Sequence, residues 1–327
     1  MRFRTGKRQI EDPSAVKMFF CTDVHGSDRC FRKFLNAGEF FDVDHLILGG
    51  DMTGKLLVPI TSRSSGYSCR FGEHTYENIG ESEATELRRA IRAQGQYPFV
   101  GTEDEVDALV DPSTRDRVFR RLVYDAVADW VQLAEERLRG SGRRCFMAPG
   151  NDDFLEIDDA LTGSEVVEFA EGRRIAIDDR HEMITTGYSN PTPWDTEREL
   201  PEPDLRARID AMAEGVVDYS NLICVLHAPP YASEIDSAPA LDANLRMKIG
   251  ASGVLMGPVG STAVRGFIED RQPLIGLHGH VHESKGTATI GRTLCVNPGS
   301  EYTDGTLAGA IVELSDGSVV RHQLVAG

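Results

Sequence analysis

Five short apolar runs, each followed closely by an Asp, Asn or His, constrain the fold of this 327-residue chain most strongly. The runs are too short for helices and are typical of buried strands; they span residues 16–21, 46–48, 145–148, 222–226 and 274–277. Between the first two, Phe31, Phe34 and Leu35 recur at helical spacing, which predicts a crossover helix and a parallel strand pair. The polar residues are then expected at the carboxyl edge of an α/β sheet, where such sheets bind ligands.

The residues that follow the first two runs have metal-binding chemistry. Asp23 and His25 lie two positions apart, and a carboxylate oxygen with an imidazole nitrogen suits Mn, Fe or Zn. Gly49 and Gly50 let the chain turn sharply and place Asp51 at the tip of the next strand. Each of these residues alone is more typical of a solvated loop or a turn, so the prediction of a metal site depends on the whole set.

Asn and His residues follow the remaining runs. Asn151 has a side-chain oxygen that could bind a metal, although most Asn residues after Gly only form turns. His227 ends the clearest buried strand and precedes two prolines, which cannot extend a ladder. His278, His280 and His282 alternate after the last run, so a turn among them is needed to divide them between two ions.

The composition is that of an acidic globular protein. The net charge is -17 and no Lys/Arg-dense stripe is present, which argues against nucleic acid as the default partner. Phosphate substrates stay compatible with this charge, because bound metal ions would dominate the local field. The six cysteines include no Cys-x-x-Cys pair and four lie in strand-like runs, which fits a reducing compartment.

The N-terminal stretch and the lengths of the apolar runs bear on where the protein is located. Residues 1–10 are basic but are not followed by the apolar stretch of a signal peptide. No run approaches the ~18 apolar residues that a membrane span needs. We therefore expect a cytoplasmic protein without a membrane partner.

Residues 55 to about 142 are the least typical part of the chain. The segment 61–76 could form a hairpin, and 83–94 and 115–139 have helical patterns. We interpret this part as an insertion of a hairpin and helices in a single domain that spans residues 1–327. The insertion could be a lid over the site or the contact through which a homo-oligomer forms.

The order D-x-H, G-D, G-N, H and G-H-x-H resembles that of the calcineurin-like metallophosphoesterase superfamily. The residues that carry the resemblance are Asp23, His25, Gly50, Asp51, Gly150, Asn151, His227, Gly279, His280 and His282. Segments 260–265, 280–284 and 297–302 also resemble those of a prokaryotic branch of the superfamily. The resemblance implies an α/β fold, a four-layer αββα sandwich of two mixed sheets flanked by helices, with a dinuclear metal site at the carboxyl ends of strands.

The resemblance also implies the ligands of that site. One ion would take Asp23, His25, Asp51 and His282, and the second Asp51, Asn151, His227 and His280, with Asp51 bridging the two. Two divalent ions (Mn, Fe or Zn, with Ni or Co as alternatives) would hold a bridging hydroxide for in-line attack on a phosphoester. The expected catalytic residues are Asp51, Asn151 and Asp152, and the residues expected to support the ligands from outside are Asp153, His278 and Asn297.

One position departs from the superfamily pattern. Many members have a His after the Gly-Asn pair, where it contacts substrate and can protonate the leaving oxygen, whereas this chain has Asp152. A carboxylate beside two dications stays ionised and is a poor proton donor. We therefore expect a small-molecule phosphoester substrate, with phosphodiesters or acidic leaving groups preferred over alkyl phosphomonoesters.

Two alternatives stay open at the level of sequence. A non-catalytic metal-binding scaffold of the same fold normally loses metal ligands, and here all seven ligand positions hold competent residues. A nuclease would share the chemistry of a phosphoesterase. The acidic composition disfavours a nuclease, although Arg88, Arg89 and Arg92 of the insertion could form a locally basic groove.

Overall fold

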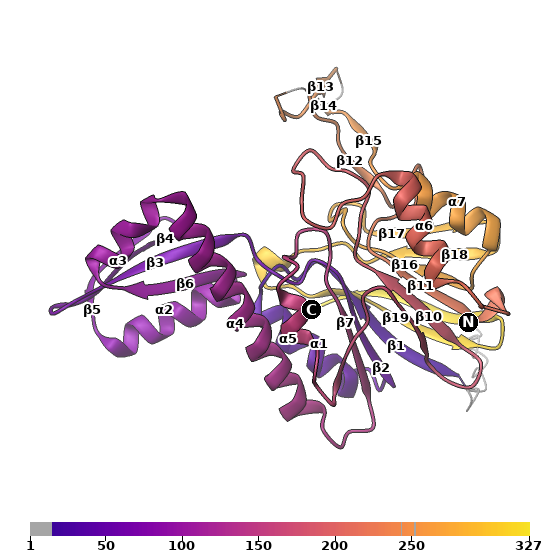
Figure 1. Cartoon of the computed structure of the whole chain (residues 1–327), viewed down its shortest axis with the longest axis horizontal. Coiled ribbons are helices and arrows are strands. Elements are labelled where there is room, and N and C mark those ends of the chain that lie inside the picture. The colour runs from indigo at the N-terminus through magenta and orange to yellow at the C-terminus, as the bar shows by residue number, and fades with distance from the viewer. Residues whose placement is uncertain (1–14, 243, 252) are drawn as a thin grey trace, which may run out of the picture.

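Two six-stranded sheets packed face to face form the centre of the computed structural model, which describes residues 15–242, 244–251 and 253–327 (Figure 1). The basic stretch 1–10 lies outside the described residues. The first sheet has the order β20-β19-β1-β2-β7-β8, with β1 Val16–Cys21, β2 His45–Gly49, β7 Arg144–Ala148, β8 Val167–Phe169, β19 Ala308–Ser315 and β20 Ser318–Ala326. Its β1, β2, β7 and β8 run parallel, whereas β19 and β20 pair antiparallel.

The second sheet has the order β17-β18-β16-β11-β10-β9, with β9 Arg173–Ala176, β10 Glu182–Thr186, β11 Leu222–Leu226, β16 Ile275–Leu277, β17 Gly286–Ile290 and β18 Thr293–Asn297. Its four inner strands are parallel and both edge strands are antiparallel. In both sheets the parallel strands therefore bring the loops at their carboxyl ends to one edge.

Alternate residues of each strand face different layers, as the period of a strand requires. In β1, Met18 and Phe20 pack into the core between the two sheets, whereas Phe19 and Cys21 pack against the outer helices. The first sheet is covered by α1 Asp28–Phe40, α4 Pro112–Leu138 and α5 Ile157–Leu161, and the second by α6 Glu202–Met212 and α7 Thr262–Arg271. The predicted four-layer αββα sandwich is confirmed.

Helix α4 begins in the insertion and ends in the main body. The side chain of Asp111 caps it by accepting a hydrogen bond from Thr114 N (2.8 Å), and Pro112 occupies the first turn. Val127 and Trp130 are buried against the first sheet and α1, where the Trp130 and Phe31 rings stack at 4.3 Å. The part of 55–142 that leaves the body is therefore shorter than the segment that the sequence marked as atypical.

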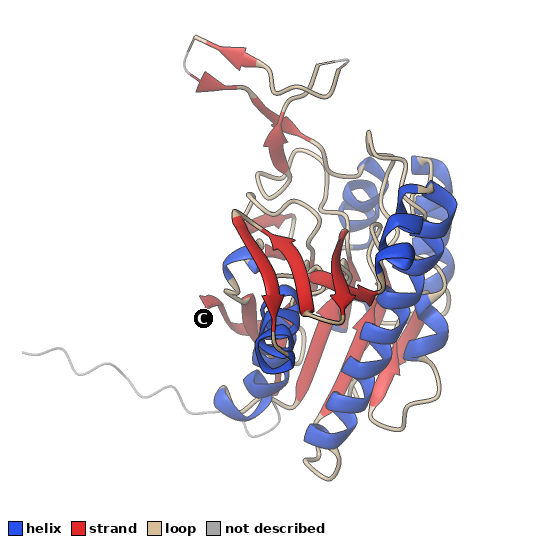
Figure 2. Ribbon diagram, turned by 90° about the vertical axis from the view of Figure 1, so that its left-hand side faces the viewer, coloured by secondary structure: helices blue, strands red, loops and turns tan. Residues whose placement is uncertain are grey.

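Residues 56–110 form a lobe beside the sandwich (Figures 1 and 2). It contains a four-stranded sheet rather than a hairpin alone, and its elements are β3 Leu56–Arg63, β4 Gly66–Phe71, β5 His74–Ile79, α2 Glu81–Ala93, β6 Gln96–Gly101, α3 Glu103–Asp107 and the 3₁₀ turn η1 Ala108–Val110. The sheet and α2 enclose a small core of their own, which includes Ile60, Leu87 and Ile91.

A β-arm projects from the second sheet at residues 237–258 (Figure 1). It consists of two two-stranded ribbons, β12 Ser237–Pro239 with β15 Met256–Pro258, and β13 Ile249–Gly250 with β14 Gly253–Val254. Exposed apolar residues gather on it, among them Met247, Ile249 and Met256. The remaining short elements are the 3₁₀ turns η2 Tyr219–Asn221 and η3 Tyr302–Asp304.

The described helices include none whose apolar stretch could cross a bilayer, and this holds for the long α4 as well. All six cysteines are buried and carry free thiols. Burial raises the pKa of the Cys145 thiol to about 12, so this thiol behaves as a small apolar side chain.

Candidate metal centre

The loops after β1 and β2 are hydrogen-bonded to one another and together present Asp23, His25 and Asp51. Asp23 N donates to Gly50 O (2.9 Å) and His25 N donates to Asp51 O (3.0 Å). All three residues have positive φ angles, 54° for Asp23, 39° for His25 and 45° for Asp51. Such angles are uncommon outside glycine and cluster at functional sites, where surrounding contacts hold them.

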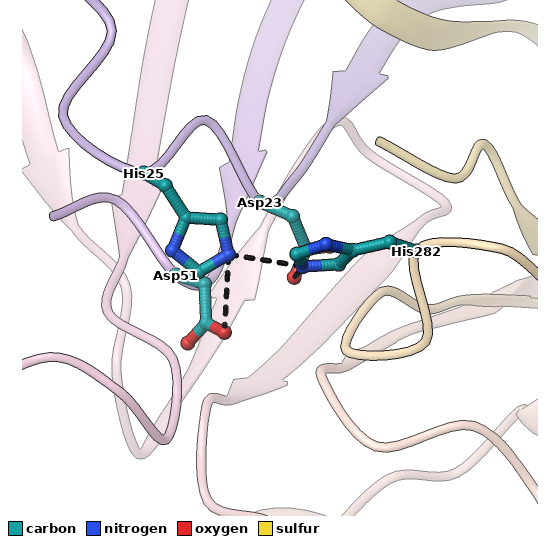
Figure 3. A group of neighbouring side chains, drawn as sticks. All are labelled: Asp23, His25, Asp51 and His282. Atoms are coloured by element: carbon teal, nitrogen blue, oxygen red, sulfur yellow. Dashed lines mark hydrogen bonds and ion pairs between the residues drawn. The ribbon is translucent and has the colours of Figure 1, made fainter. Parts of the chain in front are cut away.

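The first group of ligand atoms consists of Asp23, His25, Asp51 and His282, whose ligand atoms all lie within 4.8 Å of one another. Figure 3 shows the four side chains converging, with His25 Nε2 3.0 Å from His282 Nε2 and 3.8 Å from Asp51 Oδ2. Asp23 Oδ1 lies 3.3 Å from His282 Nε2. These atoms come from both sheets, so the group depends on the packing of one sheet on the other.

The second group consists of Asp51, His227 and His280, which also meet within 4.8 Å. His227 Nε2 lies 3.3 Å from Asp51 Oδ1, and His280 Nδ1 lies 2.7 Å from Asn151 Oδ1. The amide of Asn151 donates to Thr196 Oγ1 (3.0 Å), and this contact turns its oxygen toward the group. Asp51 therefore belongs to both groups, with Oδ1 toward His227 and Oδ2 toward His25.

Two glycines permit this close approach of the loops. A Cβ on Gly50 would lie 2.1 Å from His227 Nδ1, and a Cβ on Gly150 would lie 2.2 Å from Asp51 Oδ1. Neither contact leaves room for a side chain. The Gly-Asp and Gly-Asn pairs of the sequence are therefore steric requirements of the site and not only turn signals.

The donor set fits a cation. His25 Nδ1 faces Thr53 O (3.3 Å) and His227 Nδ1 faces Gly49 O (3.2 Å), and since a carbonyl only accepts, both Nδ1 atoms carry the hydrogen. Their Nε2 lone pairs then point toward the carboxylates of the cluster. His227 Nε2 is buried without a hydrogen-bond partner among the described residues. Lone pairs that converge in this way on carboxylates are balanced by a metal ion or by bound protons.

The protonation of the cluster shows the same imbalance of charge. Burial raises the pKa of Asp51 to about 7. At His227 burial lowers the pKa, but the charge and hydrogen bond of Asp51 together with the charge of Asp23 outweigh burial and raise the pKa to about 10. Burial lowers the pKa of His280 to about 4. At Asp23 burial is outweighed by the hydrogen bond of His282 and the charge of His227, so its pKa falls.

Asp153 lies under the ligand loops rather than among the ligands. Its carboxylate accepts hydrogen bonds from Met52 N (2.9 Å), Thr53 N (2.8 Å) and Gly150 N (2.7 Å). It thereby ties the loop of Asp51 to the loop of Asn151.

His278 and Asn297 support the histidine loops. His278 is buried, and its Nδ1 lies 2.8 Å from Leu226 O and 3.2 Å from Ala228 O, the carbonyls on either side of His227. Asn297 donates to Val281 O (2.9 Å), between His280 and His282, and accepts from Gly299 N (2.8 Å). The three residues expected outside the ligands all contact ligand-bearing loops.

The rim of the centre joins Asp152, which the sequence proposed for the site, to Lys55 and Tyr302, which it did not propose. Asp152 donates its backbone N–H to Asp51 Oδ1 (3.0 Å), and its carboxylate forms an ion pair with Lys55 Nζ. The ring of Tyr302 lies 4.7 Å from that of His25 and 6.2 Å from that of His282. Tyr302 ends the segment 297–302 noted in the sequence, but neither it nor Lys55 was expected at the site, because neither is a metal ligand at a strand end.

Comparisons with known proteins agree with this fold. No family model matches the chain. A stretch of 152 residues is 30% identical to the uncharacterized protein MJ1162 of Methanocaldococcus jannaschii; the match covers 46% of this chain and 61% of that protein, so it spans less than two thirds of the relative.

Two solved structures superpose on nearly the whole chain. One gives a TM-score of 0.55 at 15% identity and covers 96% of this chain and 98% of the other. The second, TT1561 of Thermus thermophilus, gives a TM-score of 0.52 at 12% identity and covers 96% and 99%. At these identities the likeness concerns the fold alone. The chain therefore shares the fold of these two structures, and its two packed mixed sheets agree with the sandwich that the sequence predicted.

Proposed function

We propose that the protein is a metal-dependent phosphoesterase with two divalent ions at the candidate metal centre. The observation that carries the proposal is the position of Asp51, whose two carboxylate oxygens face two separate groups of histidines. A carboxylate shared in this way is the ligand expected between two metal ions of a hydrolase. The fold supports the same class of reaction.

The residues of the centre would act either as metal ligands or as supports for the ligand loops. One ion would be held by Asp23, His25, Asp51 and His282, and the other by Asp51, Asn151, His227 and His280. Divalent ions held there supply an activated water and neutralise the phosphoryl oxygens. Asp153, His278 and Asn297 hold the ligand loops in register. Mn, Fe and Zn suit the mixed oxygen and nitrogen donors, and Ni or Co would also be accepted.

We further propose that phosphodiesters, or esters with acidic leaving groups, are the better substrates. Asp152 occupies the position from which many relatives of this fold protonate the leaving oxygen. Burial opposes its ionisation, but the ion pair with Lys55 outweighs burial and lowers the pKa of Asp152. It is therefore a carboxylate at neutral pH and donates no proton to a leaving alkoxide.

The test is hydrolysis of bis-p-nitrophenyl phosphate and p-nitrophenyl phosphate by the metal-reconstituted protein, with Asp51→Asn as the inactive comparison. We expect metal-dependent turnover that the substitution abolishes, with the diester hydrolysed faster. Two ions bound per chain without turnover for any of the five metals would favour the non-catalytic scaffold instead.

A nuclease receives less support than a small-molecule phosphoesterase. Of the three arginines that could form a basic groove, Arg88 pairs with Glu81, and Arg92 pairs with Asp28 and Asp129. Two of the three cations are therefore neutralised. A steep fall of substrate affinity with salt would reverse this ranking.

A further inference from the structure

A cleft at the root of the lobe adjoins the rim of the metal centre. It lies between β3, the α3–η1 segment and the first turns of α4, and its volume is about 640 Å³. Its apolar lining includes Leu56, Val110 and Phe119, and its charged lining residues are Lys55, Arg115 and Asp116. A cleft of this size with a mostly apolar lining and a few charged groups is typical of small-molecule sites.

Lys55 belongs both to this cleft and to the metal centre. It lines the cleft and forms the ion pair with Asp152, whose backbone is bonded to Asp51. The ion pair outweighs burial and raises the pKa of Lys55, so its ammonium stays charged. The ammonium has three N–H donors and the side chain is 57% exposed, so Lys55 can contact a second anion besides Asp152. The lobe holds the backbone next to Lys55 in position, because Gly54 N, one residue before it, donates to the hydroxyl of Tyr97 on β6 (2.9 Å).

The wall of the cleft continues into the loop that carries Asn151. The ring of Phe119 lies 5.7 Å from that of Phe154, three residues beyond Asn151, and 5.7 Å from that of Tyr97. A molecule with its phosphoryl group at the metal centre could therefore extend past Lys55 along this wall.

The exposure of the site residues points in the same direction. The side chains of Asp23 and Asp51 are 1% and 3% exposed, whereas that of Lys55 is 57% exposed. Leu56 and Val110, which both line the cleft, are 58% and 81% exposed. A ligand that covers these apolar side chains gains free energy from the surface removed from water. A phosphoester could do so with its organic group while its charged phosphoryl group contacts Lys55.

We propose that this cleft binds the organic group of the substrate and that Lys55 contacts its phosphoryl oxygens. The substrate class is then a phosphoester with an apolar, aryl-sized organic group. The inference rests on the proposed function and adds to it where the substrate lies and what chemistry selects it.

The test measures the affinity of the Mn²⁺-loaded full chain for phenylphosphonate and methylphosphonate by calorimetry. The two anions share the phosphonate group and differ only in the organic group. We expect phenylphosphonate to bind about tenfold more tightly, because its phenyl ring buries more apolar surface in the cleft than the methyl group does. Leu56→Ser and Val110→Ser should each lower this ratio to about threefold or less. Lys55→Met should weaken the binding of both anions by a similar factor of about ten.

Val217→Ser is the matched control, because Val217 is 95% exposed on a loop far from the lobe in sequence. It should change neither affinity. An affinity ratio that survives both Leu56→Ser and Val110→Ser overturns the cleft assignment, as does unchanged phosphonate binding in Lys55→Met. Absence of metal-dependent hydrolysis of any ester, with the affinity ratio as expected, would overturn the proposed function and not the cleft assignment.

Discussion

The metal centre has two regions of opposite character. The inner ligands Asp23, Asp51 and His227 have side chains exposed by 3% or less and come from the ends of strands in both sheets. The rim consists of Lys55, Asp152 and Tyr302, which lie at the root of the lobe and in loops. In contrast to the inner ligands, the Lys55 side chain is 57% exposed. In our proposal the sandwich holds the groups that carry out the reaction, and the lobe and loops select the substrate.

The largest effect should follow a change at the centre of the buried region. Asp51→Asn removes the charge shared by the two groups, and we expect activity to fall by more than about 100-fold, since even outer partners of ligands cost about 10–100-fold. Turnover and bound metal per chain would be measured together. Asp42→Asn is a matched control, because Asp42 also has a positive φ (51°) but a side chain that is 91% exposed. Equal losses in both variants would refute a special role for Asp51.

A somewhat smaller effect is expected one layer below the ligands. Asp153→Asn places an amide N–H against backbone N–H groups that now donate to a carboxylate, including those of Met52 and Gly150. We expect the free energy of unfolding to fall by about 1–3 kcal/mol and metal affinity to fall by about 10–100-fold. Urea unfolding and metal titration measure the two effects.

The control for that variant is Asp159→Asn, on the exposed side of α5. Metal affinity that stays at the wild-type value in Asp153→Asn would show that the ligand loops hold their places without this carboxylate.

At the rim, a substitution should alter selectivity more than it alters metal binding. Asp152→His restores a group that can protonate a leaving oxygen, so hydrolysis of alkyl phosphomonoesters should rise relative to bis-p-nitrophenyl phosphate by about tenfold or more. The rate ratio of the two substrates is the measurement, with bound metal as the check on the site. An unchanged ratio would mean that the missing proton donor does not explain substrate preference.

The smallest effect is expected at the aromatic part of the rim. Tyr302→Leu removes the ring that lies against His25 and His282 but leaves every proposed ligand in place. We expect kcat/KM to fall by about fivefold, in line with the ~1 kcal/mol of an aromatic contact. Tyr231→Leu, at a tyrosine that is 41% exposed, provides the comparison. A loss as large as that of Asp51→Asn would abolish the distinction between buried region and rim.

Much of the fold could be predicted because its signals are local. Apolar runs that end in a polar residue mark strand ends, and parallel strands bring those ends to one edge. The structure indeed brings the seven proposed ligands together there. The lobe was less predictable, because its strands are half-exposed and irregular in pattern. The parallel pair of β3 and β6, which β4, β5 and α2 separate in the chain, could therefore not be predicted from the sequence.

The sequence by itself determined the αββα sandwich, the set of candidate ligands and the presence of Asp152 in place of a histidine, because each depends on residue type and on spacing along one segment. Only the tertiary structure decided that Lys55 pairs with Asp152, that Tyr302 packs on His25, and that a cleft opens beside them. Those contacts join residues that lie far apart in the chain, and no periodic pattern records a meeting between loops. The candidate ligands were therefore visible in the sequence, whereas the candidate substrate site was not.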